Sequence, residues 1–325
     1  MTDLVLEVDA LDVTLFTRGG ALPAVEGFSI TVGAGETVAL VGESGCGKSL
    51  TALAIMRLLP DPPARITGGS VRLAGKNLVE LPEREMVRLR GRDMAMIFQD
   101  PMSALNPVLS IGAQLAEVLR AHTDLRSRAV HERSRELLEM VGVPDATSRL
   151  ADFPHQLSGG TCQRVMIAMA VACRPRLLIA DEATTALDVT IQAQVLALLT
   201  DIQREVGMGM LYITHDLAVV SEIAQRVVVM YAGVKVEEAS AEALFAAPLH
   251  PYTRGLLAAT PMPGAPLRAA LAEIPGRVPS LSERPAGCLF AARCPLVFDR
   301  CRAERPALHG AGAGRFVACF AVPPQ

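Results

Sequence analysis

The alternation of apolar and polar positions near the N-terminal end predicts the first strands. Apolar side chains occupy every second position from Leu4 to Val8 and from Leu11 to Leu15, and Gly19-Gly20 favours a turn. This pattern predicts two antiparallel strands. A short β-branched run, Thr37–Val41, predicts a buried strand, and the run Leu50–Leu59 predicts a helix that ends at the following proline.

Further along, the spacing of apolar residues changes from that of strands to that of helices. Thr67–Ser70 is expected to turn before a short strand at Val71–Leu73, and the run Met94–Phe98 predicts another strand. Between residues 110 and 150, apolar positions recur at helical spacing with charges between them. This stretch predicts an inserted helical subdomain, at about residues 105–165.

From residue 176 onward, predicted strands and helices alternate. Strands are expected at Leu177–Ala180, Leu211–Thr214 and Val227–Met230, and a helix at Ile191–Ile202. Such alternation predicts a mostly parallel sheet covered by helices. After about residue 245 the composition shifts to Pro, Gly, Ala and Arg, which predicts a separate, loop-rich extension.

Composition narrows the classes of partner. The net charge is −3, Trp is absent and aromatic residues make up 4% of the chain, so neither charge nor stacking favours a nucleic acid. The acidic start, with Asp3, Glu7 and Asp9, does not resemble a secretory signal. No apolar run reaches the roughly 18 residues that span a bilayer. We therefore expect the chain to stay in the cytosol and to reach a membrane only through a partner.

The turn between the strand Thr37–Val41 and the following helix has the pattern G-x-x-x-x-G-K-[ST]. Glycine-rich backbone at a helix N-terminus forms a cradle of N–H groups for phosphates. The lysine of this pattern reaches the β- and γ-phosphates, and the hydroxyl binds Mg²⁺. The predicted nucleotide-binding residues are Gly42, Glu43, Ser44, Gly45, Cys46, Gly47, Lys48 and Ser49.

Two carboxylates follow the apolar strand Leu177–Ala180. Side chains at the carboxyl end of a parallel strand face the ligand crevice. Asp181 is placed to hold the Mg²⁺, and Glu182 to orient or polarise the attacking water. Taken alone, this motif also fits a strand that ends in two solvated acids.

A third motif identifies the family. Leu157-Ser158-Gly159-Gly160 resembles the LSGGQ-type signature of ABC (ATP-binding cassette) ATPases. Ser158 and the N–H groups of Gly159 and Gly160 would begin a helix at Gln163–Cys173, an arrangement that suits a γ-phosphate. The resemblance implies a P-loop NTPase fold of the α/β class, with an antiparallel β subdomain.

The same resemblance gives roles to residues that carry no signal alone. Gln99 resembles the glutamine of the Q-loop, which senses Mg²⁺ and the γ-phosphate, and His215 resembles the switch histidine. Ala186-Leu187-Asp188 looks like the D-loop at the dimer interface. In this family two cassettes enclose two ATP molecules head to tail, so the signature of one subunit faces the phosphate loop of the other. Glu182, His215 and Gln99 are the expected catalytic group.

An aromatic side chain should stack on the adenine upstream of the phosphate loop. Phe16 is the candidate for this contact. Leu15 is the alternative occupant of that register, in which case Phe16 is a core residue.

Several longer strings narrow the resemblance to ATPase subunits of bacterial dipeptide and oligopeptide importers. This implies import of peptides powered by ATP hydrolysis, at the cytoplasmic face of the cell membrane. The implied partners are a second ABC ATPase subunit, expected to form a heterodimer, two transmembrane permease subunits and an extracytoplasmic peptide-binding protein. The strings are Val41–Ser49, Phe98–Pro107, Ala180–Thr190, Met230–Gly233 and His250–Arg254, with parts of the cysteine-containing tail.

Other functions remain open at this point. An importer of another solute, such as nickel or glutathione, fits the same cassette, and so does a soluble cassette that acts on nucleic acid or ribosomes. Thr161-Cys162 stands where the subfamily has Met-Arg, and Ala183 where it has Pro. Neither departure replaces a group that touches phosphate or metal.

Four of the seven cysteines lie in the last 38 residues, at Cys288, Cys294, Cys301 and Cys319. In a reducing cytosol such a group favours metal binding over disulfides. Zinc sites prefer closer pairs, and Cys294-Pro295 is similar to the Cys-Pro of some iron–sulfur motifs. The resemblance also implies a 4Fe–4S cluster, since the extension is associated with one in some members of the family. We therefore expect such a cluster, with zinc or free thiols as the alternatives.

Together these observations predict two parts. Residues 1–245 form an ABC nucleotide-binding domain that uses ATP and Mg²⁺, and residues 246–325 form the importer-type extension with its four cysteines.

Overall fold

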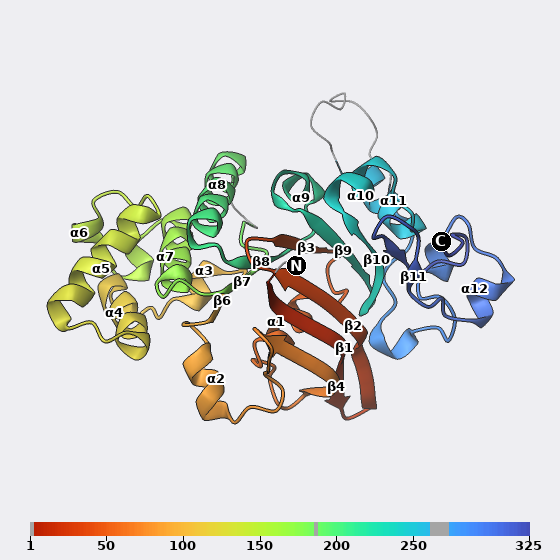
Figure 1. Cartoon of the computed structure of the whole chain (residues 1–325), viewed down its shortest axis with the longest axis horizontal. Coiled ribbons are helices and arrows are strands. Elements are labelled where there is room, and N and C mark those ends of the chain that lie inside the picture. Colours follow the sequence, from red (N-terminus) through yellow and green to blue (C-terminus); the bar gives the residue numbers. More distant parts are fainter. Residues whose placement is uncertain (1–2, 185–187, 261–272) are drawn as a thin grey trace.

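Two sheets and a helical subdomain make up most of the molecule (Figure 1). The computed structural model describes residues 3–184, 188–260 and 273–325. Within these ranges no helix combines the length and the apolar character that crossing a bilayer requires.

The smaller sheet is antiparallel, in the order β2-β1-β4-β5, as the alternating N-terminal pattern predicts. Its strands are β1 (Leu4–Thr17), β2 (Gly20–Gly33), β4 (Ala64–Leu73) and β5 (Lys76–Asn77). The prediction of a turn at Thr67–Ser70 is wrong, because β4 continues through these residues. The register against β1 shifts there, and Gly69, at φ +80°, lies so close to the carbonyl of Ala10 that only a glycine fits.

The larger sheet is mixed, in the order β11-β12-β10-β9-β3-β8-β7-β6. The pairs from β6 to β9 are parallel, and those from β9 to β11 are antiparallel. Its strands are β3 (Thr37–Val41), β6 (Met94–Ile97), β7 (Leu177–Asp181), β8 (Gly209–Thr214), β9 (Arg226–Tyr231), β10 (Val234–Ser240), β11 (His309–Gly310) and β12 (Phe316–Val317). The central strands are buried on both faces, as their continuous apolar runs predict.

The helix after the phosphate loop, α1 (Lys48–Ile55), is shorter than predicted. It ends because Arg57 takes a left-handed conformation at φ +52°, and not because of the proline. The guanidinium of Arg57 donates hydrogen bonds to the carbonyls of Leu78 and Leu81, which hold this turn in place.

The inserted helices form a bundle at one end of the molecule, shown in yellow and green in Figure 1. Leu115 and Leu119 pack with Leu137 and Leu138 in a core that continues under the larger sheet. The bundle contains α3 (Pro101–Ala104), α4 (Ile111–His122), α5 (Ser127–Met140), α6 (Ala146–Arg149), the 3₁₀ turn η1 (Pro154–Gln156) and α7 (Gly159–Val171). The remaining helices of the cassette are α2 (Glu83–Leu89), α8 (Val189–Val206), α9 (Leu217–Ile223) and α10 (Ala241–Ala246).

The C-terminal extension is not separate from the cassette, contrary to the expectation from composition. Its strand β12 pairs with β10 of the larger sheet. Tyr231 of β9 packs edge-on against Tyr252 and Phe290, and this aromatic cluster joins the two parts. The extension contains α11 (Pro251–Ala259), η2 (Leu281–Glu283), η3 (Ala291–Arg293) and α12 (Asp299–Ala303).

Candidate nucleotide-binding site

Four neighbouring strands bring the separate motifs to one edge of the larger sheet. Val41 pairs with Thr214, Asp181 with Ile213, and Ile97 with Ala180, so β3, β8, β7 and β6 end at the same level. The loop that begins at Gly42, the pair Asp181-Glu182, Gln99 and His215 follow these strand ends directly. This edge is where ligands bind in open parallel sheets.

The phosphate loop needs glycine at the positions where the sequence places it. Gly42 has φ +156°, and a Cβ atom there would lie 2.3 Å from the carbonyl oxygen of Met230. Gly45 and Gly47 also have positive φ, +79° and +106°. Gly47 directly precedes α1, so the N-terminus of that helix points at the loop.

Lys48 is buried beneath the loop. Its Nζ donates hydrogen bonds to the carbonyls of Gly42, at 2.8 Å, and Glu43, at 3.1 Å. In this structure the Lys48 ammonium therefore binds carbonyls of its own loop. In the nucleotide complex the same ammonium is expected to bind the phosphates.

Ser49 and Asp181 form the oxygen-rich part of the site. The Ser49 hydroxyl donates a hydrogen bond to Asp181 Oδ1 at 3.1 Å. Burial raises the pKa of the Asp181 carboxyl above its usual range, and the Ser49 hydroxyl acts in the opposite direction. A hydroxyl and a carboxylate side by side are the oxygen ligands that Mg²⁺ prefers, so these residues fit the metal.

Glu182 is held between the other two predicted catalytic side chains. Gln99 Nε2 donates a hydrogen bond to its Oε2 at 2.8 Å, and His215 Nδ1 lies 3.2 Å from its Oε1. The backbone of Glu182 has φ +48°, a left-handed conformation that is unusual for this residue type. Its N–H is fixed by the carbonyl of Ile213.

A cavity of about 320 Å³ is lined by the phosphate loop with Lys48 and Ser49, and by Gln99 and Glu182. Asp181 and His215 adjoin it through their contacts with Ser49 and Glu182. Leu15 also lines the cavity, whereas Phe16 does not. Phe16 is 48% exposed and lies under the guanidinium of Arg65, at 5.9 Å. Leu281, from η2 of the extension, also lines the cavity. The sequence reasoning missed Leu281, because nothing in its surroundings suggests a nucleotide contact.

The signature residues lie elsewhere in the chain's own fold. Ser158 caps α7, where its hydroxyl accepts the N–H of Thr161 at 3.2 Å, and Gly159 and Gly160 form the first turn. None of the three lines the 320 Å³ cavity. Asp188 caps α8 by accepting the N–H of Ile191, while Ala186 and Leu187 lie outside the described residues. The helix α7 thus begins four residues earlier than predicted, at the glycines themselves.

The two unusual positions near the signature are accommodated by packing. Cys162 is fully buried, with its Sγ 3.5 Å from the carbonyl of Pro154. The carbonyl of Ala183 accepts a hydrogen bond from Gln163 Nε2 at 2.5 Å. Cys162 thus packs α7 against η1, whereas the contact at Ala183 is made by its backbone carbonyl and does not depend on the side chain.

The four cysteines of the extension line one small pocket. Phe290, Phe298 and Phe320 form much of its apolar wall. Burial raises the pKa of the Cys288, Cys294 and Cys319 thiols, and neighbouring cysteines of the group raise each of them further. Within the described ranges, however, no three or more His, Cys, Asp or Glu side chains take up positions that would hold a metal ion.

Comparison with known sequences decides the family. A family model for the ABC transporter matches residues 25–185, and one for the C-terminal region of oligopeptide/dipeptide transporters matches residues 236–301. The oligopeptide transport ATP-binding protein AppD of Bacillus subtilis is 49% identical over 97% of this chain and 96% of its own length. The chain belongs to the ABC transporter ATP-binding family.

Other members of the family support the same assignment. The dipeptide transport ATP-binding protein DppD of Escherichia coli is 49% identical over 97% of this chain and 95% of its own length. Among solved structures, the ATP-binding cassette MJ0796, as a dimer in a post-hydrolysis state with ADP and Pi, matches with a TM-score of 0.66 and 25% identity. That match covers 73% of this chain and 98% of the cassette. The P-loop NTPase fold predicted from the motifs is thereby confirmed.

Proposed function

We propose that this ABC subunit binds MgATP in the 320 Å³ cavity and hydrolyses it to power peptide import. The observation that carries the proposal is the convergence of Lys48, Ser49, Asp181 and the Glu182 group at one sheet edge. The relatives AppD and DppD are named for oligopeptide and dipeptide transport. Peptides are therefore the substrate class we assign, ahead of nickel, glutathione or a nucleic acid.

The residues divide the work according to their positions. The loop N–H groups and Lys48 bind the phosphates, and Ser49, Asp181 and Gln99 hold the metal. When bound, Mg²⁺ neutralises charge on the β- and γ-phosphates. Glu182 orients the attacking water and accepts its proton, because its carboxylate stands at the mouth of the same cavity. Leu15 and Leu281 offer the base an apolar wall.

Gln99 and His215 hold Glu182 before reaction, through the two hydrogen bonds to its carboxylate. A γ-phosphate would compete for both side chains, since one is an amide donor and the other an imidazole. We infer that nucleotide binding releases Glu182 toward the water and frees the Gln99 amide, which could then serve as a ligand of the metal. Gln99 lies just before α3 of the helical bundle. A permease docked on this bundle could therefore be coupled to the movement of Gln99.

A second cassette completes the site. Ser158, Gly159 and Gly160 present a capped helix N-terminus away from the chain's own cavity, and Asp188 begins the neighbouring helix α8. We propose that these residues meet the γ-phosphate of the nucleotide on a companion ATPase subunit, in a heterodimer. Two permease subunits and an extracytoplasmic peptide-binding protein complete the assembly, with this chain on the cytoplasmic face of the membrane.

The Glu182→Gln variant tests the proposal. It keeps the shape and hydrogen-bond capacity of the side chain but not the base, so ATP turnover should fall by about 10²- to 10⁴-fold while ATP still binds. Trapped dimers should then appear by size-exclusion chromatography with ATP. Glu205→Gln, on the exposed face of α8, is the control. Turnover at the unmodified rate in Glu182→Gln would refute the role.

We further propose that Cys288, Cys294, Cys301 and Cys319 hold a 4Fe–4S cluster. Their convergence on one apolar pocket supports this, and four Cys thiolates are the ligand set that holds such a cluster. Protein purified without oxygen should be brown and contain iron and sulfide. Zinc without iron would assign the site to the alternative metal, and a folded, colourless, metal-free protein would contradict any metal there.

A further inference from the structure

A side chain of the C-terminal extension holds the beginning of the phosphate loop. Arg293, the last residue of η3, donates hydrogen bonds from its two terminal nitrogens to the Glu43 carboxylate, at 2.6 and 2.8 Å. Glu43 is the residue that follows the first glycine of the loop. The pair therefore joins two segments that are 250 residues apart in the sequence.

Contacts other than the one with Glu43 also hold the Arg293 side chain in place. Only 4% of its side chain is exposed. Its Nε donates to the carbonyl of Pro275 at 2.8 Å, and its guanidinium lies 5.8 Å from the ring centre of Tyr231 and 5.9 Å from that of Phe290. An arginine fork held in this way presents two parallel donors in one direction.

The backbone of Glu43 is held from the same side. Its N–H donates a hydrogen bond to the hydroxyl of Tyr252, at 2.8 Å, and Tyr252 is fully buried in α11. The carbonyl of Glu43 accepts from Lys48 Nζ. Every polar group of this loop residue is thus engaged, two of them by the extension and one by the lysine that is expected to bind phosphate.

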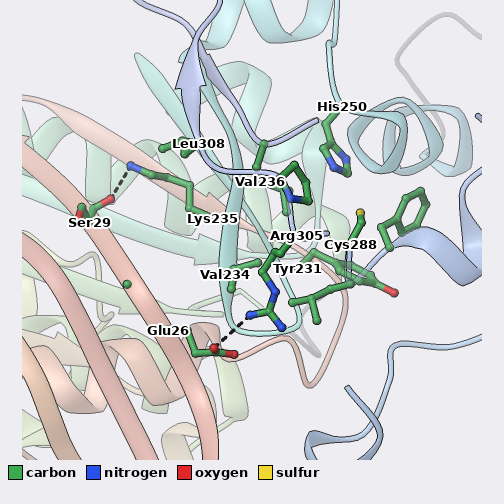
Figure 2. A pocket seen from close by; sticks show the side chains of 15 residues that line it. Glu26, Ser29, Tyr231, Val234, Lys235, Val236, His250, Cys288, Arg305 and Leu308 are labelled. Atoms are coloured by element: carbon green, nitrogen blue, oxygen red, sulfur yellow. Dashed lines mark hydrogen bonds and ion pairs between the residues drawn. The ribbon is translucent and has the colours of Figure 1, made fainter. Parts of the chain in front are cut away.

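The extension is anchored around this contact by further pairs. A cavity of about 200 Å³ lies between β2, the β9–β10 hairpin and the extension (Figure 2). Figure 2 shows Arg305 reaching to Glu26 of β2, an ion pair of 3.1 Å, beside Tyr231. Arg284 pairs with the same carboxylate at 2.6 Å. Two arginines that flank Arg293 in the chain, Arg284 and Arg305, are therefore both paired with β2 of the cassette.

A carboxylate inside a phosphate-binding loop is electrostatically unfavourable. Glu43 brings a negative charge next to the site of a triphosphate, where it would repel the ligand. A bidentate arginine cancels that charge and turns the carboxylate away from the loop interior. Since Glu43 also orients the carbonyl that holds Lys48, its position sets the starting geometry of that lysine.

We propose that Arg293 is a positioning residue for nucleotide binding: through Glu43 it neutralises and shapes the phosphate loop, so that the extension controls the affinity for ATP. The inference rests on the proposed MgATP site. It also gives the cysteine pocket a route to that site, because Arg293 directly precedes Cys294 in the chain. Any change that moves η3 would also move Arg293, the partner of Glu43.

Isothermal titration of the full-length protein with MgATP tests the inference. Arg293→Ala should raise the dissociation constant about tenfold, in the range found when an outer partner of a ligand-holding group is removed. Arg293→Lys keeps the charge but not the fork and should lie in between. Arg302→Ala is the matched control, since Arg302 is an exposed arginine of the same extension.

A rescue experiment separates positioning from loss of folding. In Glu43→Gln the negative charge is gone, so adding Arg293→Ala to it should restore most of the ATP affinity lost in Arg293→Ala alone, even if the melting temperature stays low. Affinity in Arg293→Ala equal to that in Arg302→Ala, or a double variant as weak as Arg293→Ala, would overturn the inference. Lys48→Ala reports on the site itself: unchanged ATP binding there would overturn the proposed function instead.

Discussion

At the scale of one residue, Asp181 lowers the stability of the protein at neutral pH, because its buried carboxylate is placed to bind the metal. Burial raises the pKa of its carboxyl above the usual range. Below the usual value the folded and unfolded forms are both protonated. Between the usual and the raised value the folded form binds more protons, so the free energy of unfolding falls as the pH rises, and the loss is complete above the raised pKa.

Asp181→Asn should therefore stabilise the protein at neutral pH when no nucleotide is added. Asparagine has the same shape and can still accept the Ser49 hydroxyl, but it carries no buried charge. The melting temperature should rise by about 2–4 °C, the shift that about 1 kcal/mol gives in a domain of 150–250 residues, while ATPase activity is lost. Asp201→Asn, on an exposed helix face, should leave melting unchanged. A lower melting temperature in Asp181→Asn would contradict this account.

Leu15 and Phe16 provide a second test at the residue scale. Leu15 lines the cavity, whereas Phe16 points to Arg65. Leu15→Ala should weaken ATP binding by about fivefold, because roughly 1 kcal/mol of apolar contact with the base is lost. Phe16→Ala should change it by less than about twofold, and equilibrium titration with ATP distinguishes the two. The reverse order would restore Phe16 as the contact of the base.

Site residues that belong to a local motif can be predicted from the sequence. Residues that contact the site from a distant part of the chain cannot. Gly42, Lys48, Ser49 and Asp181 were identifiable because strand, turn and spacing fix their places. Leu281 and Arg293 reach the same site from the extension, across 250 residues in the case of Arg293. Only the tertiary packing around Tyr231 brings them there, and no periodicity in the chain encodes that contact.

At the scale of elements, the start of α7 combines a structural cap with a predicted phosphate contact. The Ser158 hydroxyl accepts the N–H of Thr161. Ser158→Ala should lower the stability by about 0.5–2 kcal/mol, the usual cost of a lost helix cap, and should also weaken ATP-dependent dimerisation. Ser158→Thr keeps a capping hydroxyl, so its stability should be nearly unchanged. Thermal melting and size-exclusion chromatography with ATP measure the two effects separately.

Element boundaries depart from the sequence prediction where backbone conformation overrides propensity. The left-handed Arg57 ends α1 several residues early, although the residues after it favour helix. The glycines at 68 and 69 predict a turn, but they lie at a shift in the register between β1 and β4. In both places a close tertiary contact, from Leu78 and Leu81 or from Ala10, decides the outcome.

At the scale of the whole molecule, the fold class follows from the alternation of strands and helices, but the place of the extension does not. The composition of residues 246–325 indicates loops, which says nothing about where those loops pack. The structure places the described residues of this extension, 246–260 and 273–325, against β9 and β10, next to the phosphate loop. The helical bundle lies at the opposite end of the molecule (Figure 1). The nucleotide cavity therefore lies between two parts that can each act on it.

The pairing of β12 with β10 has a consequence for the behaviour of the protein in concentrated solution. Without it, the middle of β10, at Glu237 and Glu238, would offer its backbone donors and acceptors to another copy of the chain. The outermost strand is instead β11, of two residues, which is too short to template self-association. Val317→Pro breaks this cover, so light scattering should report intermolecular sheet and aggregates, whereas Val317→Thr should stay dispersed. The small C-terminal hairpin of β11 and β12 is thus a safeguard against precipitation.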